Sequence, residues 1–191
     1  MDKLPPEISK ILVPPDVIHS RVVELAEKIN HDYRDVERLL LLGILRGAFI
    51  FMADLTRELK IPHIVDFMAL TSYKKNTSLG EVRILMDSRE PMRDQHILIV
   101  EDILDSGNTL NYLYRIIGER EPASLHTCVL VRKKREYVNL QIPIDYVGFE
   151  IPDVWVVGYG LDYDNRFRTL PYIAELIPQV DPPTPWGPSR M

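Results

Sequence analysis

Two uninterrupted apolar runs constrain the fold of this chain more than any other feature. LLLLGIL spans residues 39–45 and ILIV spans residues 97–100. Runs with no polar side chain on either face are typical of strands buried on both sides, as in a parallel sheet covered by helices. Other segments have the composition of strands or the apolar stripe of helices. They predict strands at 63–70, 82–86, 125–131 and 146–149, and helices at 18–29, 48–59 and 109–118.

This alternation of strand and helix predicts an α/β fold with a mostly parallel central sheet flanked by helices. Ligands of such sheets bind beyond the carboxyl ends of the strands. The polar residues that directly follow the apolar runs are therefore the candidate functional residues.

The length of 191 residues predicts one domain, which we place at residues 1–178. A proline-rich tail follows at 179–191. Five prolines fall between Pro178 and Pro188, so this stretch is neither a regular helix nor a central strand. The tail is either an extended appendage or an arm that docks Trp186 on a neighbouring subunit.

Charge and cysteine content exclude several classes of protein. The net charge of −5 makes the chain a poor binder of nucleic acid or of an anionic membrane. The single cysteine, Cys128, excludes an internal disulfide and a cysteine zinc cluster, and we expect it to be buried. The N-terminus lacks the apolar core of a signal peptide, and the most apolar stretch is too short to span a bilayer. We therefore expect a cytoplasmic protein with no membrane or nucleic-acid partner.

The segment ILIVEDILDSGNTL at 97–110 carries the richest chemistry. The strand ends in two acids, Glu101 and Asp102, and a short polar loop at 105–109 leads into a helix. The loop's backbone N–H groups suit a phosphate at a helix N-terminus. The carboxylates would repel that phosphate unless they face ribose hydroxyls or Mg²⁺. The segment thus predicts a ligand that combines phosphate, diol and metal.

Two alternatives explain less of this segment. An ordinary helix capped by Asp105 or Ser106 accounts for one acid and leaves the acid pair unexplained. A phospho-acceptor aspartate at a strand end, as in receiver domains, leaves the Ser-Gly-Asn-Thr run unexplained.

VEDILDSGNTL resembles the phosphoribosyl pyrophosphate signature of type I phosphoribosyltransferases. Over about residues 8–177 the chain is similar to the hypoxanthine-guanine phosphoribosyltransferases, and most of all to bacterial members. The resemblance implies the type I fold, with a small hood formed by the N-terminal and C-terminal segments. It also implies a purine salvage enzyme that moves 5-phosphoribosyl from phosphoribosyl pyrophosphate to N9 of hypoxanthine or guanine. The products would be IMP or GMP and pyrophosphate, the cofactor Mg²⁺, and the assembly a homo-oligomer, either a dimer or a tetramer.

Within the signature, the resemblance assigns a role to each polar residue. Asp105 corresponds to the general base at purine N7, a role that suits a carboxylate within hydrogen-bond reach. Glu101 and Asp102 correspond to the acids that hold the sugar hydroxyls and Mg²⁺. The 5′-phosphate would bind the loop residues Ser106, Gly107, Asn108 and Thr109.

Two further loops match the family near the reacting centre. GILRGA at 43–48 corresponds to the pyrophosphate loop, with Leu45, Arg46 and Gly47 as binding residues and a cis peptide bond at Leu45–Arg46. The family usually has lysine at the position of Arg46, and an arginine can bind pyrophosphate bidentately. Ser72 and Tyr73 match the pair on a lid that closes over the reacting centre.

The last two motifs concern the purine and the second metal. In VRKKRE at 131–136, one lysine would bind the purine 6-oxo group. Counting from the acidic loop selects Lys133, whereas counting back from IPD selects Lys134. We prefer Lys133 because it directly follows the predicted strand.

The second motif is IPDVWVVGYGLDYDNRFR. By the resemblance, Trp155 would stack on the purine and backbone groups of Val156 would contact the base. Asp162 would lie near the second Mg²⁺, and Arg168 would bind pyrophosphate.

Two other functions remain open on the same fold. One is the same transfer to xanthine, which differs from guanine only at the 2-position. The other is a non-catalytic regulator that senses nucleotides. The regulator is less favoured because the chain keeps Lys133 and Trp155 and is acidic overall.

Overall fold

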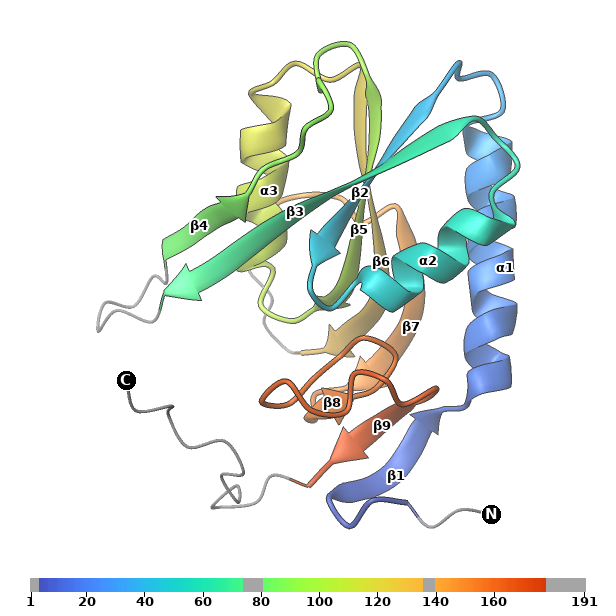
Figure 1. Cartoon of the computed structure of the whole chain (residues 1–191), viewed down its shortest axis with the longest axis vertical. Coiled ribbons are helices and arrows are strands. Elements are labelled where there is room, and N and C mark those ends of the chain that lie inside the picture. Colours follow the sequence, from blue (N-terminus) through green and yellow to red (C-terminus); the bar gives the residue numbers. More distant parts are fainter. Residues whose placement is uncertain (1–3, 74–80, 136–139, 178–191) are drawn as a thin grey trace, which may run out of the picture.

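The computed structural model describes residues 4–73, 81–135 and 140–177, and its central feature is a six-stranded sheet (Figure 1). The strand order is β4-β3-β2-β5-β6-β7. Five of these strands are parallel to their neighbours, and β4 is an antiparallel edge strand. The bounds are β2 Leu39–Leu45, β3 His63–Tyr73, β4 Glu81–Met86, β5 His96–Leu104, β6 Ser124–Lys134 and β7 Tyr146–Pro152. The predicted α/β fold with a mostly parallel sheet is confirmed.

Helices cover both faces of this sheet. They are α1 at Pro15–Asp32, α2 at Phe49–Glu58 and α3 at Asn108–Gly118. α1 and α2 pack on one face and α3 packs on the other. The predicted apolar stripe of α1 is buried, but the helix extends beyond 18–29 at both ends. Pro15 starts it, because proline at the first helical position needs no N–H partner.

Alternate leucines of β2 explain why this strand lies in the middle of the core. Leu39 and Leu41 belong to the cluster under α1 and α2, whereas Leu40 and Leu42 belong to the cluster under α3. All four are fully buried. The two faces of one strand therefore hold both helical layers, as the unbroken apolar run predicts.

β5 and β6 continue further than the apolar runs indicate. Glu101 and Asp102 lie within β5, and Lys133 lies within β6 rather than directly after it. The ladder continues because Glu101 pairs with Val129 and Lys133 pairs with Ile151. The polar residues are thus held on rigid strand ends.

A small antiparallel sheet forms the predicted hood. It has the order β1-β9-β8, with bounds Ile8–Val13, Ile173–Leu176 and Val156–Val157. It joins the N-terminal segment to the C-terminal segment, and the arrowheads of β2 and β6 point towards it (Figure 1). The carboxyl ends of the central strands therefore face the hood.

The structure can be compared with two expectations from the sequence, the burial of the single cysteine and the lack of a membrane-spanning helix. Cys128 lies buried in β6, as expected, and burial raises the pKa of its thiol. In the described part of the chain, no helix is long and apolar enough to cross a membrane.

Candidate active site at the carboxyl end of the sheet

A cavity of about 290 Å³ lies where β5 ends and α3 begins. Glu101 and the loop residues Asp105 to Thr109 line it. Gly107 is the N-cap residue of α3 and has φ 85°, a conformation that glycine adopts without strain. The cap is thus neither Asp105 nor Ser106, so the helix-capping alternative does not explain these side chains. The cavity brings backbone amides of a helix N-terminus next to an acid, as the sequence predicts.

Glu101, which is buried and lines this cavity, and Asp102, which is partly buried, form an acid pair near the end of β5. Glu101 is 8% exposed, and its Oε2 atom has no hydrogen-bond partner. Burial raises the pKa of both carboxyl groups, and for Glu101 the neighbouring Asp102 adds to the effect. A buried acid without a partner is costly, because the charged form has lost its water. A cation or a ligand hydroxyl would supply the missing partner.

The loop after β2 packs directly against Asp102. The Leu45–Arg46 peptide bond is cis, as the resemblance implies, and Arg46 is exposed. A Cβ atom on Gly47 would lie 1.6 Å from Asp102 Oδ2, and one on Gly160 would lie 2.0 Å from the Gly47 carbonyl oxygen. Only glycines permit this approach, so the loop is held between the acid pair and the hood.

Lys133 points into the site and Lys134 points away from it. Lys133 Nζ lies 3.4 Å from Asp105 Oδ1 and 3.5 Å from Asp153 Oδ1, and its side chain is 9% exposed. Lys134 is 65% exposed and contacts Glu150 on the outer side of the sheet. The geometry therefore favours Lys133 over Lys134 as the candidate ligand of the base.

An aromatic ring and an ion pair of the hood complete the site. Trp155 is 59% exposed, with its ring 5.8 Å from Lys133 Nζ and edge-on to Tyr163. Val156 is buried in β8. Arg168 lies 2.7 Å from Asp162 Oδ1 and donates a hydrogen bond to the Gly160 carbonyl oxygen. Together these residues form the wall of the site that faces the strand ends.

The three candidate metal ligands do not form one cluster. Asp162 uses Oδ1 to pair with Arg168 and Oδ2 to accept a hydrogen bond from the Asn165 amide. Among the described residues, no group of three histidine, cysteine or acidic side chains is arranged to hold a metal. The pair of Glu101 and Asp102 still suits Mg²⁺, which takes one or two carboxylates and completes its shell with substrate oxygens and water.

Some of the predicted site residues lie outside the part of the chain that the structure describes. Ser72 and Tyr73 belong to the end of β3, but their side chains lie outside the described residues, as does the loop that follows at 74–80. The tail at 179–191, with Trp186, also lies outside them.

Two charged residues of the site were not singled out from the sequence. Arg135 Nη2 lies 2.8 Å from Asp105 Oδ1, and Arg135 Nε lies 2.9 Å from Asp153 Oδ2. This contact with Arg135 lowers the pKa of Asp153. Arg135 lies in the motif VRKKRE and Asp153 lies in the motif IPD. The opposite charges that follow two predicted strands were the sequence signal that could have indicated this ion pair.

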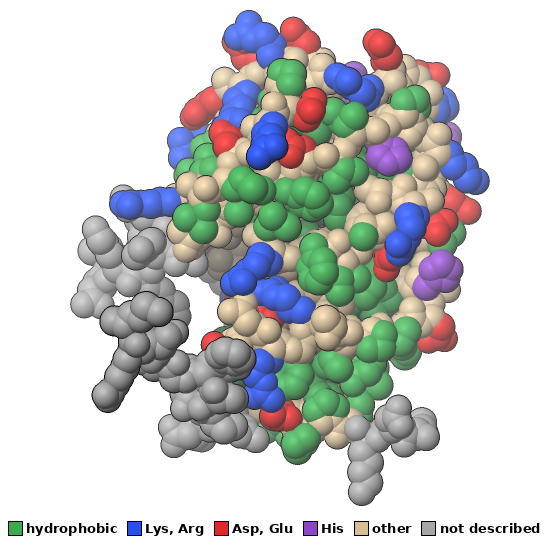
Figure 2. All heavy atoms as spheres, in the orientation of Figure 1, with side chains coloured by type: hydrophobic (Ala, Val, Ile, Leu, Met, Phe, Trp, Pro, Cys, Tyr) green, Lys and Arg blue, Asp and Glu red, His purple; other side chains and the backbone are tan. Residues whose placement is uncertain are grey.

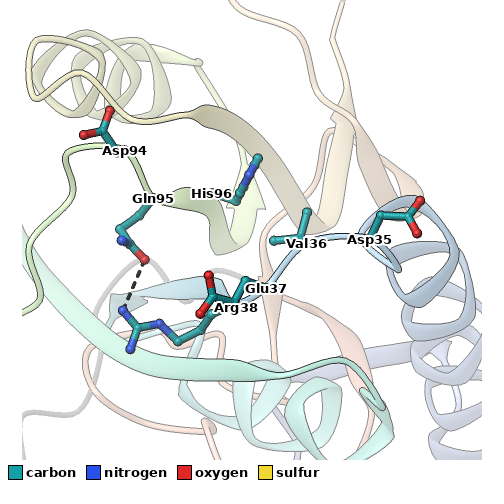
Figure 3. Close-up of a pocket in the computed structure, with 7 residues that line it drawn as sticks. All are labelled: Asp35, Val36, Glu37, Arg38, Asp94, Gln95 and His96. Atoms are coloured by element: carbon teal, nitrogen blue, oxygen red, sulfur yellow. Dashed lines mark hydrogen bonds between the residues drawn. The ribbon is translucent and has the colours of Figure 1, made fainter.

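A second cavity lies at the opposite end of the sheet, where β2 and β5 begin (Figure 3). It measures about 540 Å³ and is lined by Asp35, Val36, Glu37, Arg38, Asp94, Gln95 and His96. Arg38 donates a hydrogen bond to Gln95 Oε1 across it. None of the candidate site residues lines this cavity.

Known proteins resemble this chain over most of its length. The chain matches the phosphoribosyl transferase domain family over residues 16–164. It is 46% identical over 163 residues to the hypoxanthine-guanine phosphoribosyltransferase of Dictyostelium discoideum, covering 83% of this chain and 90% of that protein. It is 46% identical over 172 residues to the hypoxanthine phosphoribosyltransferase of Salmonella typhimurium, covering 88% and 95%.

The solved structures agree with the sequence relatives. Trypanosoma cruzi hypoxanthine phosphoribosyltransferase in complex with the product IMP superposes with a TM-score of 0.86 at 41% identity, covering 94% of this chain and 100% of that one. The backbone architecture of this chain is therefore that of a solved hypoxanthine phosphoribosyltransferase. The chain belongs to the hypoxanthine-guanine phosphoribosyltransferase family.

Proposed function

We propose that this protein transfers the 5-phosphoribosyl group from phosphoribosyl pyrophosphate to N9 of hypoxanthine or guanine. The observation that carries the proposal is the meeting of Asp105, Lys133 and the exposed ring of Trp155 near the buried, unpartnered Glu101. A carboxylate, a cation and a flat ring are what a 6-oxopurine needs to be deprotonated, oriented and stacked.

The sugar phosphate would bind between the acid pair and the start of α3. The amides at Ser106 to Thr109 face the 5′-phosphate, where the helix N-terminus favours negative charge. Glu101 and Asp102 accept hydrogen bonds from the ribose hydroxyls. This arrangement gives a partner to the buried Oε2 atom of Glu101.

The purine would stack on Trp155, with its 6-oxo group towards Lys133. A lysine only donates hydrogen bonds, so it suits the 6-oxo acceptor and not the 6-amino group of adenine. Backbone groups of Val156 contact the edge of the base. These contacts favour hypoxanthine and guanine over adenine.

In the reaction, the bond from N9 to the anomeric carbon forms while the bond from that carbon to pyrophosphate breaks. Such a displacement passes through a state like an oxocarbenium ion. Asp105 takes the proton that leaves purine N7. Arg46 and Arg168 neutralise the departing pyrophosphate. By the resemblance to the family, Ser72 and Tyr73 would help to exclude water. Arg168 must turn from Asp162, its partner in this structure.

Mg²⁺ fits this site as the cofactor. Glu101 and Asp102 would hold one ion and Asp162 a second. When bound, Mg²⁺ offsets the charge of the pyrophosphate and orients it.

The test is nucleotide formation by the purified protein with phosphoribosyl pyrophosphate and Mg²⁺. Hypoxanthine, guanine, xanthine and adenine are offered separately. Turnover on hypoxanthine or guanine that stops without Mg²⁺ supports the proposal, and the kcat/KM ratios rank the bases. A clear preference for xanthine would mean that xanthine, rather than hypoxanthine or guanine, is the substrate. Tight binding of phosphoribosyl pyrophosphate without turnover on any base would instead indicate a regulator.

We also propose that the protein assembles as a homo-oligomer, a dimer or a tetramer. Hydrophobic side chains gather on the face that carries β3 and α2 (Figure 2). The exposed hydrophobic residues of these two elements include Phe49 and Val65. Light scattering during gel filtration would measure the mass of the assembly. The cytoplasmic location and the lack of a nucleic-acid partner stay predictions.

A further inference from the structure

The guanidinium group of Arg135 joins two parts of the site that lie far apart in the chain. Its Nη2 atom lies 2.8 Å from Asp105 Oδ1, and its Nε atom lies 2.9 Å from Asp153 Oδ2. Asp105 opens the loop after β5, whereas Asp153 directly follows β7. One side chain therefore bridges two loops at the same end of the sheet.

Lys133 closes the bridge into a ring of alternating charges. Its Nζ atom lies between the same two carboxylates, 3.4 Å from Asp105 and 3.5 Å from Asp153. The side chains of Lys133 and Arg135 are 9% and 29% exposed, whereas those of Asp105 and Asp153 are 47% and 44% exposed, so water screens the pairs from the carboxylate side. Each carboxylate thus faces two cations at once.

The bridge ends two residues before Trp155. Asp153 and Trp155 belong to the segment that links β7 to β8, so a shift of Asp153 displaces the aromatic ring. The other end of the bridge is Asp105, the group that we place at purine N7. The distance between these two ends determines whether a stacked purine presents N7 to the carboxylate.

Arginine is better suited to this position than lysine. Its planar guanidinium holds Nε and Nη2 at a fixed spacing, so one rigid group lies close to both carboxylates, whereas a lysine offers one compact charge. Lys133 already supplies such a point charge between the same carboxylates. A second lysine would therefore duplicate the charge without fixing the geometry.

We propose that Arg135 is a positioning residue that holds Asp105 and the Trp155 segment at the separation required by the purine. The proposal rests on the proposed function, because it gives Asp105 and Trp155 their roles. Arg135 acts through these two groups and does not itself touch the reacting atoms.

The first experiment compares Arg135→Gln, Arg135→Lys and the wild-type protein. For Arg135→Gln we expect kcat to fall roughly ten- to a hundred-fold and the KM of the purine to rise, because the reacting groups are misplaced. The KM of phosphoribosyl pyrophosphate should stay within about twofold, since the loop amides hold its phosphate. Arg135→Lys should recover only part of the loss.

Arg132→Gln is the matched control. Arg132 lies three residues earlier, within β6, but is ion-paired with Glu150 and 42% exposed. The Arg132→Gln variant should keep the kcat and both KM values of the wild-type protein. Equal loss in both arginine variants, or equal effects on both KM values, would mean a general structural role and overturn the proposal.

A double-mutant cycle with Asp153→Asn tests the bridge itself. If Arg135 acts by joining Asp153 to Asp105, the double variant should lose little more activity than either single variant. Additive losses would show that the two residues act separately and would overturn the proposal. An increase in kcat in Arg135→Gln would do the same, because Arg135 would then compete with the purine for Asp105.

The outcomes separate this inference from the function on which it rests. If the wild-type protein and Arg132→Gln form no nucleotide from any base, the proposed function fails. If both turn over normally and Arg135→Gln matches them, the function stands and the positioning role fails.

Discussion

The two ends of the central sheet differ in how their polar groups are satisfied. At the amino end, His96 Nδ1 lies 2.8 Å from Ser124 Oγ, and Arg38 donates a hydrogen bond to Gln95. At the carboxyl end, Glu101 Oε2, Asp105 Oδ1 and Arg135 Nε are buried and have no hydrogen-bond partner. The ion pairs of Asp105 and Arg135 are close but lack hydrogen-bond geometry. Among the described residues, these three atoms are the only buried side-chain nitrogens or oxygens without such a partner.

This difference shows that the size of a cavity does not identify the site. The amino-end cavity measures about 540 Å³ and the carboxyl-end cavity about 290 Å³. Buried polar groups are normally satisfied within the protein, and of the three atoms only Glu101 Oε2 has neither a hydrogen bond nor an ion pair, so this atom awaits a ligand. Glu101 lines the smaller cavity, which is therefore the candidate active site.

The pKa values of Asp66 and Glu101 show the same contrast between a carboxyl group with hydrogen-bond donors and one without. Burial acts to raise the pKa of Asp66, but hydrogen bonds from the Ser88 hydroxyl and three backbone amides lower it overall. Glu101 is buried without such donors, and its pKa is raised. Asp66 thus stabilises the fold, whereas Glu101 is kept ready for a ligand at some cost in stability.

The largest effect is expected for Asp105→Asn at the carboxyl end. The amide cannot take a proton from the purine, so kcat should fall about 10²- to 10⁴-fold while phosphoribosyl pyrophosphate still binds. Steady-state kinetics and a binding titration measure the two quantities. Asp94→Asn at the amino end is the control, since asparagine tolerates its φ of 59° and its activity should not change. A normal kcat in Asp105→Asn would remove Asp105 from the role of base.

Gly47→Ala should produce the next largest loss. The new methyl group would lie 1.6 Å from Asp102 Oδ2, so the carboxylate or the loop must move. We expect kcat/KM to fall roughly a hundred-fold, as for other small displacements of reacting groups. Gly118→Ala is the control because no atom lies within 4 Å of its added Cβ. Full activity in Gly47→Ala would show that this close contact is unimportant.

Lys133→Ala should weaken the binding of the purine. Losing a charged hydrogen-bond donor to the 6-oxo group should raise the KM of the purine about ten- to a hundred-fold. The KM of phosphoribosyl pyrophosphate should change much less. Lys134→Ala, on the exposed side of the same strand, should leave both values unchanged. If only Lys134→Ala raises the KM of the purine, the register of the motif is wrong by one residue.

The smallest effect concerns stability and its dependence on pH. The pKa of Asp66 is lower in the folded state than in the unfolded state. Its ionised carboxylate therefore adds to the free energy of unfolding in full above the unfolded pKa, and this stabilisation is lost as the pH falls through the folded pKa. Asp66→Asn should therefore cost about 1 kcal/mol at pH 7. The gap from the wild type should narrow on acidification.

Urea unfolding at neutral and acidic pH measures this gap. Asp35→Asn is the control, since its carboxylate is 86% exposed and its loss should be below about 0.5 kcal/mol. A gap that widens at acidic pH would contradict the assignment.

The order of the strands could be predicted only in part from the sequence. The apolar runs of β2 and β5 indicate burial on both faces, and the two strands are indeed neighbours in the middle of the sheet. The lengths of β5 and β6 could not be read, because pairing between strands continues after the apolar pattern has ended. The antiparallel direction of β4 also depends on its partner, β3.

For the site, local motifs were informative where the residues are close in the chain. Glu101, Asp102 and the loop at 105–109 could be interpreted together because one strand-to-loop segment carries them all. Arg135 and Asp153 were missed because a run of cations does not show which side chain faces inward. The contact between Gly47 and Gly160 was missed because it joins segments more than a hundred residues apart.

The sequence by itself determined the layered α/β fold, the acid-rich strand end and the resemblance to a family. Periodicity and short motifs act over a few residues, and these features need no more than that. The tertiary structure decided which lysine faces the site, which polar atoms lack partners and which arginine joins the two loops. These depend on how the ends of β5, β6 and β7 meet, because there residues that are distant in the chain come into contact.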